Sequence, residues 1–297
     1  MVAEVSIFAG VQLLLGSEAG LISKTRLTTL FAVLLVGVIS LVMAGCGSSS
    51  DDSSSTSASG GGGEVITVGS DVPYAPFEEF GKSKSEFTGF DVELMEAVAE
   101  SVGREAEFQD TSFDTIFTYL AQGKFDAVAS AATITDDREK TVDFTNPYYL
   151  SEQAILVKEG GTIDSVEALK GATIGVQKGT TGEEFVNEKT EAGELRSYPS
   201  GPDAVNALNS GTVDAVVIDI PVAEKAVEST SGLEISAPIS TEEEYGFAVA
   251  QGDEELLEEL NEGLKNVEED GMYAKIYKKW FHHEPPASIN SATHKAS

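Results

Sequence analysis

From residue 65 onward the chain alternates short apolar runs with segments of helical periodicity, and this pattern limits the folds open to it. In the first helical segment, Phe90, Leu94 and Val98 recur at the spacing of one helix face. We expect strands at Val65–Gly69, Ala127–Ala129, Ile155–Val157, Thr173–Val176, Val213–Ile218 and Phe247–Ala250. We expect helices at Phe90–Val102, Thr181–Lys189, Pro202–Asn209, Pro221–Glu228 and Asp253–Glu269. Alternation of this kind predicts an α/β fold with mostly parallel sheets.

A segment near the N-terminus has the pattern of an export signal. Lys24 and Arg26 precede an uncharged, mostly apolar stretch that ends just before the sole cysteine, Cys46. The sequence Met43-Ala44-Gly45-Cys46 resembles the lipobox of bacterial lipoproteins. That resemblance implies cleavage before the cysteine and attachment of a diacylglycerol to its thiol. Residues 1–45 would then be upstream residues and the signal peptide. An uncleaved transmembrane helix is the alternative, because the stretch is barely long enough to span a bilayer.

The segment after Cys46 has the composition of a flexible linker. Residues 47–63 are Gly, Ser, Asp, Thr and Ala only, so they offer little apolar surface to bury and we expect them to be disordered. Such a linker spans roughly 20–25 Å, which suits a tether that holds a domain close to a membrane. We expect residues 285–297 to form a second disordered segment.

Charge and residue counts exclude several classes of function. The chain has 50 acidic against 19 basic residues, a formal net charge of −31, so its surface would repel nucleic acid and an anionic bilayer. One cysteine allows neither an internal disulfide nor a cysteine-based metal cluster. The three histidines, His282, His283 and His294, all lie near the C-terminus, which argues against a histidine-dependent triad or zinc site. We therefore expect no metal and no cofactor.

Six segments together resemble the polar amino-acid family (family 3) of solute-binding proteins, which includes glutamine, histidine and lysine/arginine binders. The likeness covers about residues 64–284, with the segments in the family's order and spacing. They are Gly69-Ser-Asp-Val-Pro-Tyr-Ala-Pro-Phe-Glu78, Gly89-Phe-Asp-Val-Glu-Leu94, Thr133-Ile-Thr-Asp-Asp-Arg138 with Val142-Asp-Phe-Thr-Asn-Pro-Tyr-Tyr149, Gly175-Val-Gln-Lys-Gly-Thr-Thr181, Asp214-Ala-Val-Val-Ile-Asp219 and Tyr277-Lys-Lys-Trp-Phe281.

The resemblance implies a periplasmic-binding-protein-like type II fold, in which two α/β lobes are joined by two crossover strands. Lobe 1 would comprise residues 64–153 and 247–284, and lobe 2 residues 154–246. A ligand would lie in the cleft between the lobes, which close on it by a hinge motion.

The resemblance also assigns partners to the charged ends of a free amino acid. A closed cleft removes both charges from water, so each needs a partner. Arg138 would hold the α-carboxylate through its planar fork, and Thr181, at a helix N-terminus, would hold it from the other lobe. Asp219 would accept from the α-ammonium, together with the carbonyl of Ala131 and the hydroxyl of Thr133.

Four further positions match those that surround the ligand side chain in the family. Tyr74 and Phe113 would sandwich it. Asp71 would contact the distal polar group of the ligand side chain, where its carboxylate favours a cation or an amide and disfavours a carboxylate. Gln177 departs from glutamine binders, which commonly have Lys there, and so favours a basic ligand. Arginine, lysine, histidine, ornithine and glutamine all fit, and cystine fits less well.

Taken without the resemblance, the same residues have ordinary structural interpretations. Arg138 lies in a charged run, Asp219 could cap the next helix, and Asp71 could be a turn residue or a cap. Tyr74 and Phe113 could be core aromatics. We assign Tyr148, Tyr149 and Trp280 to packing, and His282 and His283 to a solvated end of the chain.

The combined expectation is a monomeric, lipid-anchored, extracytoplasmic binding protein without catalytic activity. It would deliver its amino acid to the permease and ATPase subunits of an ABC importer. One alternative is an enzyme like the cyclohexadienyl dehydratases, which share this fold, although Asp71 would oppose their dicarboxylate substrate. The other alternative is a stand-alone amino-acid sensor.

Overall fold

The computed structural model describes residues 64–287. The predictions for the signal peptide, Cys46, the linker and residues 288–297 lie outside this range. Within it, no helix combines the length and the apolar character needed to cross a bilayer.

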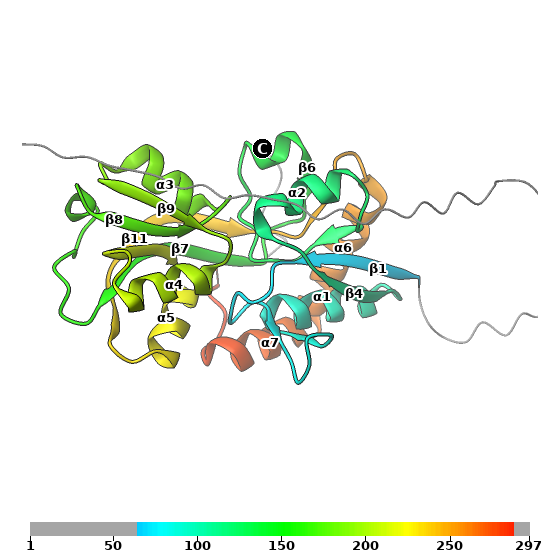
Figure 1. Cartoon of the computed structure of the whole chain (residues 1–297). Coiled ribbons are helices and arrows are strands. Elements are labelled where there is room, and N and C mark those ends of the chain that lie inside the picture. Colours follow the sequence, from blue (N-terminus) through cyan, green and yellow to red (C-terminus); the bar gives the residue numbers. More distant parts are fainter. Residues whose placement is uncertain (1–63, 288–297) are drawn as a thin grey trace, which may run out of the picture. The chain divides into compact units, whose positions relative to one another are not determined.

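The first sheet has the strand order β4-β1-β5-β12-β6. Strand β1 lies between two layers of helices, and its residues Ile66 and Val68 are fully inaccessible to solvent. Figure 1 shows α2 on one side of β1, and α1 with α7 on the other. The strands are β1 (Val65–Ser70), β4 (Glu105–Asp110), β5 (Ala127–Val128), β6 (Val142–Phe144) and β12 (Ala248–Ala250). The helices are α1 (Phe90–Ser101), α2 (Phe113–Ala121), α6 (Glu254–Glu269) and α7 (Met272–Phe281).

The second sheet has the order β11-β7-β10-β8-β9 and its own helices. Val186 of α3 packs against one face of this sheet, while Leu208 of α4 and Val222 of α5 pack against the other. The strands are β7 (Tyr149–Lys158), β8 (Thr173–Gln177), β9 (Glu194–Tyr198), β10 (Ala215–Asp219) and β11 (Leu233–Tyr245). The helices are α3 (Thr181–Lys189), α4 (Gly201–Ser210) and α5 (Ile220–Ser229). Short elements complete the chain: β2 (Glu79–Phe80), β3 (Phe87–Thr88), η1 (Arg138–Lys140) and η2 (Glu167–Leu169).

Two long strands connect the sheets. The chain leaves the first sheet after β6, enters the second as β7, and returns through β11 to β12. β7 and β11 pair antiparallel, with breaks in register between Ile235 and Ala237 and between Ile239 and Glu243. This is the two-lobed type II fold that the resemblance implied. The exact lobe boundaries remain predictions.

In each sheet four of the five strands run in one direction and one strand runs against them, so the expectation of mostly parallel sheets is confirmed. β1 runs parallel to β4 and β5, but β12 runs antiparallel to both β5 and β6. In the second sheet β7 runs antiparallel to β10 and β11. The opposed strands, β7 and β12, each enter their sheet from the other lobe instead of through a helix, so the βαβ connection does not fix their direction.

The residues assigned to packing and to the solvated end lie as expected. Tyr148 and Tyr149 are buried, and the Tyr148 ring stacks on Phe247 with centroids 4.4 Å apart. Trp280 is half-buried against the core, and His282 and His283 are exposed.

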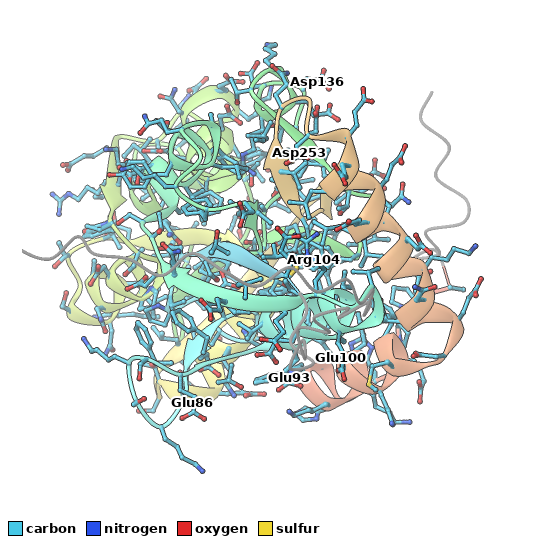
Figure 2. The ribbon with its side chains drawn as sticks, turned by 90° about the vertical axis from the view of Figure 1, so that its right-hand side faces the viewer. Glu86, Glu93, Glu100, Arg104, Asp136 and Asp253 are labelled. Carbon is cyan, nitrogen blue, oxygen red and sulfur yellow. The ribbon has the colours of Figure 1, made fainter. Side chains whose placement is uncertain are left out.

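Carboxylates are spread over the outer surface of the described part. Figure 2 shows Glu86, Glu100, Asp136 and Asp253, all of them exposed, on separate loops and on the ends of α1 and α6. These labelled carboxylates are dispersed over the solvated surface, where each stays in contact with water.

Candidate functional site

All nine residues predicted to bind the ligand line one cavity. They are Asp71, Tyr74, Phe113, Ala131, Thr133, Arg138, Gln177, Thr181 and Asp219. Three further residues complete the lining: Glu78, Ser130 and Thr180. The sequence analysis gave these three no role. Ser130 and Thr180 each lie beside a predicted site residue, which is the signal that could have found them.

The two sheets bring these residues together at the carboxyl ends of their strands. In the first sheet Asp71 follows β1, and Ala131 lies a few residues after β5. In the second sheet Gln177 ends β8, Asp219 ends β10, and Thr181 opens α3. Strand ends are where open α/β sheets present their ligand-binding groups, because the backbone there leaves the sheet and the side chains face a crevice.

Arg138 spans the cleft from the first lobe. Its Nη1 donates to the carbonyl oxygen of Thr133 at 2.7 Å, and its Nη2 donates to that of Gly179, in the loop before α3, at 3.2 Å. The guanidinium carbon lies 5.2 Å from the ring centroid of Phe113 and 4.9 Å from that of Phe117, within range of a cation–π attraction. Burial lowers the pKa of Arg138, which nonetheless keeps its charge.

Asp219 is the carboxylate of the second lobe in this cavity and is 7% exposed. The hydroxyl of Tyr74 donates to it across the cleft, and Nε2 of Gln153 donates to it at 2.6 Å. Burial, together with the nearby charge of Glu243, raises the pKa of Asp219 to about 7. A cation in the cavity would favour the ionised carboxylate and so offset both effects.

Asp71 and Gln177 meet from opposite lobes. Nε2 of Gln177 donates to the Asp71 carboxylate, and both side chains are buried. The backbone N–H of Asp71 donates to Oγ of Ser130 at 2.9 Å, which fixes the residue on the first lobe. Burial raises the pKa of Asp71 to about 7. A carboxylate here, held by an amide from the other lobe, still has lone pairs that can accept from a ligand donor.

A buried carboxyl pair lies beneath the loop that carries Ala131. The loop is strained, since Ala131 has φ of +44°, a conformation that non-glycine residues seldom adopt. Asp91 accepts from the Ala131 backbone N–H at 2.7 Å, and Glu78 accepts from Oγ of Ser130 at 2.8 Å. Burial and the charge of Asp91 raise the pKa of Glu78 well above its usual range. The pair holds the loop in place, and the sequence analysis missed this role.

The tyrosine and phenylalanine of the site differ in their surroundings. Tyr74 lies against the start of α4, where a Cβ atom at Gly201 would be only 3.0 Å from its ring. Phe113, the first residue of α2, faces the Arg138 guanidinium. The cavity therefore has an aromatic wall, one cation and carboxylates at separate points. Among residues 64–287, no group of His, Cys, Asp and Glu side chains could hold a metal ion.

Comparison with curated proteins gives relatives over most of the described part. The chain is 36% identical over 224 residues to a probable histidine-binding protein of Neisseria gonorrhoeae, covering 73% of this chain and 83% of that one. It is 33% identical over 207 residues to the ABC transporter glutamine-binding protein GlnH of Bacillus subtilis, covering 68% and 76%.

Comparison with solved structures also gives amino-acid-binding proteins. An ancestral arginine-binding protein bound to arginine is similar with a TM-score of 0.70 and 38% identity, covering 73% of this chain and 98% of that one. The ancestral amino acid-binding protein AncCDT-1, a precursor of cyclohexadienyl dehydratase, has a TM-score of 0.67 and 39% identity over 73% and 95%. The profile of the bacterial extracellular solute-binding proteins, family 3, matches residues 66–283. On these grounds the chain belongs to family 3 of the bacterial extracellular solute-binding proteins.

Proposed function

We propose that this protein captures a basic amino acid or glutamine between its lobes and delivers it to the permease and ATPase subunits of an ABC importer. The observation that carries the proposal is the charge arrangement of the cavity, which is lined by a cation, Arg138, and by carboxyl groups that include Asp71 and Asp219. A free amino acid with a polar or cationic side chain presents the complementary set. Relatives named for histidine and glutamine binding support the ligand class.

The ligand would lie with its carboxylate toward Arg138 and the N-terminus of α3. There the backbone N–H of Thr181 is one of the first-turn donors that lack a partner within the helix. Its ammonium would lie toward Asp219, Ala131 and Thr133. The side chain would pass between Tyr74 and Phe113 toward the pair formed by Asp71 and Gln177. Groups from both lobes would then contact one ligand, so binding would favour closure.

A thermal-unfolding screen of the twenty amino acids and ornithine tests the proposal. We expect arginine, lysine, histidine, ornithine or glutamine to raise the unfolding midpoint. The gain in unfolding free energy should be about 3–4 kcal/mol at ligand concentrations of about 100–1,000 times Kd. Acidic amino acids should give no shift, since Asp71 opposes a side-chain carboxylate. A screen in which no amino acid stabilises the protein would refute the assignment.

We infer that the protein is not an enzyme, although the similarity to a precursor of cyclohexadienyl dehydratase keeps an enzymatic alternative open. A prephenate-type substrate carries two carboxylates, and Asp71 would repel one of them inside a buried cavity. Incubation with prephenate or arogenate, followed by an absorbance scan for an aromatic product, separates the two functions. We expect no product; turnover would favour the enzyme.

A further inference from the structure

Two buried polar side chains on the crossover strands lie behind the cavity without lining it. Gln153 of β7 is 2% exposed and Glu243 of β11 is 5% exposed. In the strand register Gln153 pairs with Ile239, yet its side chain bonds to that of Glu243 at 2.9 Å. The break in register makes this contact possible, and Glu242 within it has φ of +50°. Such a backbone is uncommon outside glycine.

Glu243 accepts hydrogen bonds from hydroxyls on both lobes. Oε2 accepts from Oγ1 of Thr133, on the first lobe, at 2.7 Å, and from Oγ1 of Thr181, on the second lobe, at 2.9 Å. Each threonine hydroxyl has one proton, and both protons are used here. The hydroxyls can then offer only lone pairs to a ligand. They suit an ammonium and disfavour a carboxylate, so Thr181 is left with its backbone N–H for the carboxylate.

Gln153 links Glu243 to the main acceptor of the site. Its Nε2 donates to two carboxylates, Oδ1 of Asp219 at 2.6 Å and Oε1 of Glu243 at 2.9 Å, and makes a longer contact with Oγ1 of Thr181 at 3.4 Å. The side-chain amide of Gln153 thus bridges Glu243 and Asp219. The negative charge of Glu243 disfavours the ionised form of Asp219. A cation between the threonine hydroxyls and Asp219 would stabilise the ionised forms of both buried carboxylates, Asp219 and Glu243.

We propose that Glu243 is a positioning residue for the ligand's α-ammonium, because it turns the hydroxyls of Thr133 and Thr181 into acceptors and adds negative charge behind Asp219. This role rests on the proposed function and refines it. It distinguishes the ammonium-binding end of the cavity, whose hydroxyls donate to Glu243, from Arg138 and Gln177, which donate to other groups.

Calorimetry on Glu243→Gln with two probes tests the role. The probes are L-arginine and 5-guanidinopentanoic acid, which is arginine without its α-ammonium. The glutamine side chain removes the charge and can donate a proton to a hydroxyl, so we expect L-arginine to bind about tenfold more weakly or worse. The affinity for 5-guanidinopentanoic acid should change by less than about threefold, since it lacks the group that Glu243 serves.

Each other outcome has a definite meaning. An equal loss for both probes would show a merely structural role, and no loss for L-arginine would show no role; either result overturns the proposal. If the wild-type protein binds no amino acid at all, the proposed function fails instead. Should Glu243→Gln not unfold cooperatively, Glu243→Asp keeps the charge but is one methylene too short for both hydroxyls. It should give the same selective loss.

Glu242→Gln is the matched control. Glu242 precedes Glu243 on the same strand but is exposed, so the substitution makes the same change in net charge at a solvated position. Its affinities for both probes should equal those of the wild type. A loss equal to that of Glu243→Gln would mean that overall charge, and not the position of Glu243, sets the affinity.

Discussion

At Arg138, one side chain joins the two lobes through its hydrogen bonds to Thr133 and Gly179. Replacing it by alanine would leave the ligand carboxylate buried without a cationic partner. We predict that Arg138→Ala weakens the binding of the ligand by about 2–5 kcal/mol, measured by calorimetry. Arg196→Ala is the control, because Arg196 is exposed on β9 and pairs with Glu194 away from the cavity. Unaltered affinity of Arg138→Ala would contradict the site assignment.

The two acidic residues at the cavity also predict a pH dependence. Burial raises the pKa of Asp71 and of Asp219 to about 7 in the free protein, so both carboxyls are partly protonated below this pH. A cationic ligand favours their ionised forms, so binding must release protons there. The affinity for L-arginine should therefore fall as the pH falls below about 7 and level off above it.

Calorimetry in two buffers of different protonation enthalpy measures this release directly. At about pH 6 the apparent binding enthalpy should depend on the buffer, and at about pH 8 it should not. The same enthalpy in both buffers at the lower pH would show that Asp71 and Asp219 do not change protonation on binding.

At the scale of the element, the close packing of α1 on α6 depends on one glycine. A Cβ atom at Gly263 would lie 2.7 Å from Cγ1 and 2.8 Å from the carbonyl oxygen of Val98. Alanine stabilises a helix by about 1 kcal/mol relative to glycine. Here the added methyl group would clash with the Val98 backbone and force α1 and α6 apart. We predict that Gly263→Ala lowers the free energy of unfolding by about 1–3 kcal/mol.

Denaturant unfolding measures this effect, with Glu262→Ala as its control. Glu262 is the exposed neighbour on the same helix, so its substitution should change stability by less than about 0.5 kcal/mol. Greater stability of Gly263→Ala would mean that α1 and α6 adjust to the methyl group without cost.

Elements differ in how well the sequence predicts them. β1 and β10 are buried apolar runs, and both were expected close to where they lie. β4 was missed, because it is an edge strand with Glu105 and Glu107 exposed and has no buried apolar run to indicate it. For α6 the predicted first residue, Asp253, is the N-cap, where its carboxylate accepts from the backbone N–H of Leu256.

At the scale of the whole molecule, we propose anchorage of the extracytoplasmic domain through a lipid on Cys46. Cys46→Ser removes the thiol that would carry the diacylglycerol. In a bacterial host, the wild-type protein should partition with membranes and into detergent, since two acyl chains give stable anchoring. The variant should lose this partition, while Ser53→Ala, in the same Ser/Gly segment, should keep it. Detergent partition of Cys46→Ser would refute the anchor.

The sequence by itself determined the alternation of strands and helices, and its resemblance to the family identified the nine residues that line the cavity. Much of this information is local, since Gln177 and Asp219 end strands and Thr181 opens a helix. The expected roles of Arg138 and Asp219 needed the resemblance as well, because a charged run and a helix cap look the same without it.

Only the tertiary structure decided how polar groups far apart in the chain meet behind the site. Gln153 and Glu243 are 90 residues apart, and they touch because β7 and β11 pair with a break in register. Likewise the contacts of Glu78 with Ser130, and of Asp91 with Ala131, depend on how the loops around β1 and β5 pack. A buried carboxylate such as Glu243 determines whether a neighbouring hydroxyl donates or accepts at the cavity. The sequence could name Thr133 and Thr181, but the fold determined that both present lone pairs to the cavity.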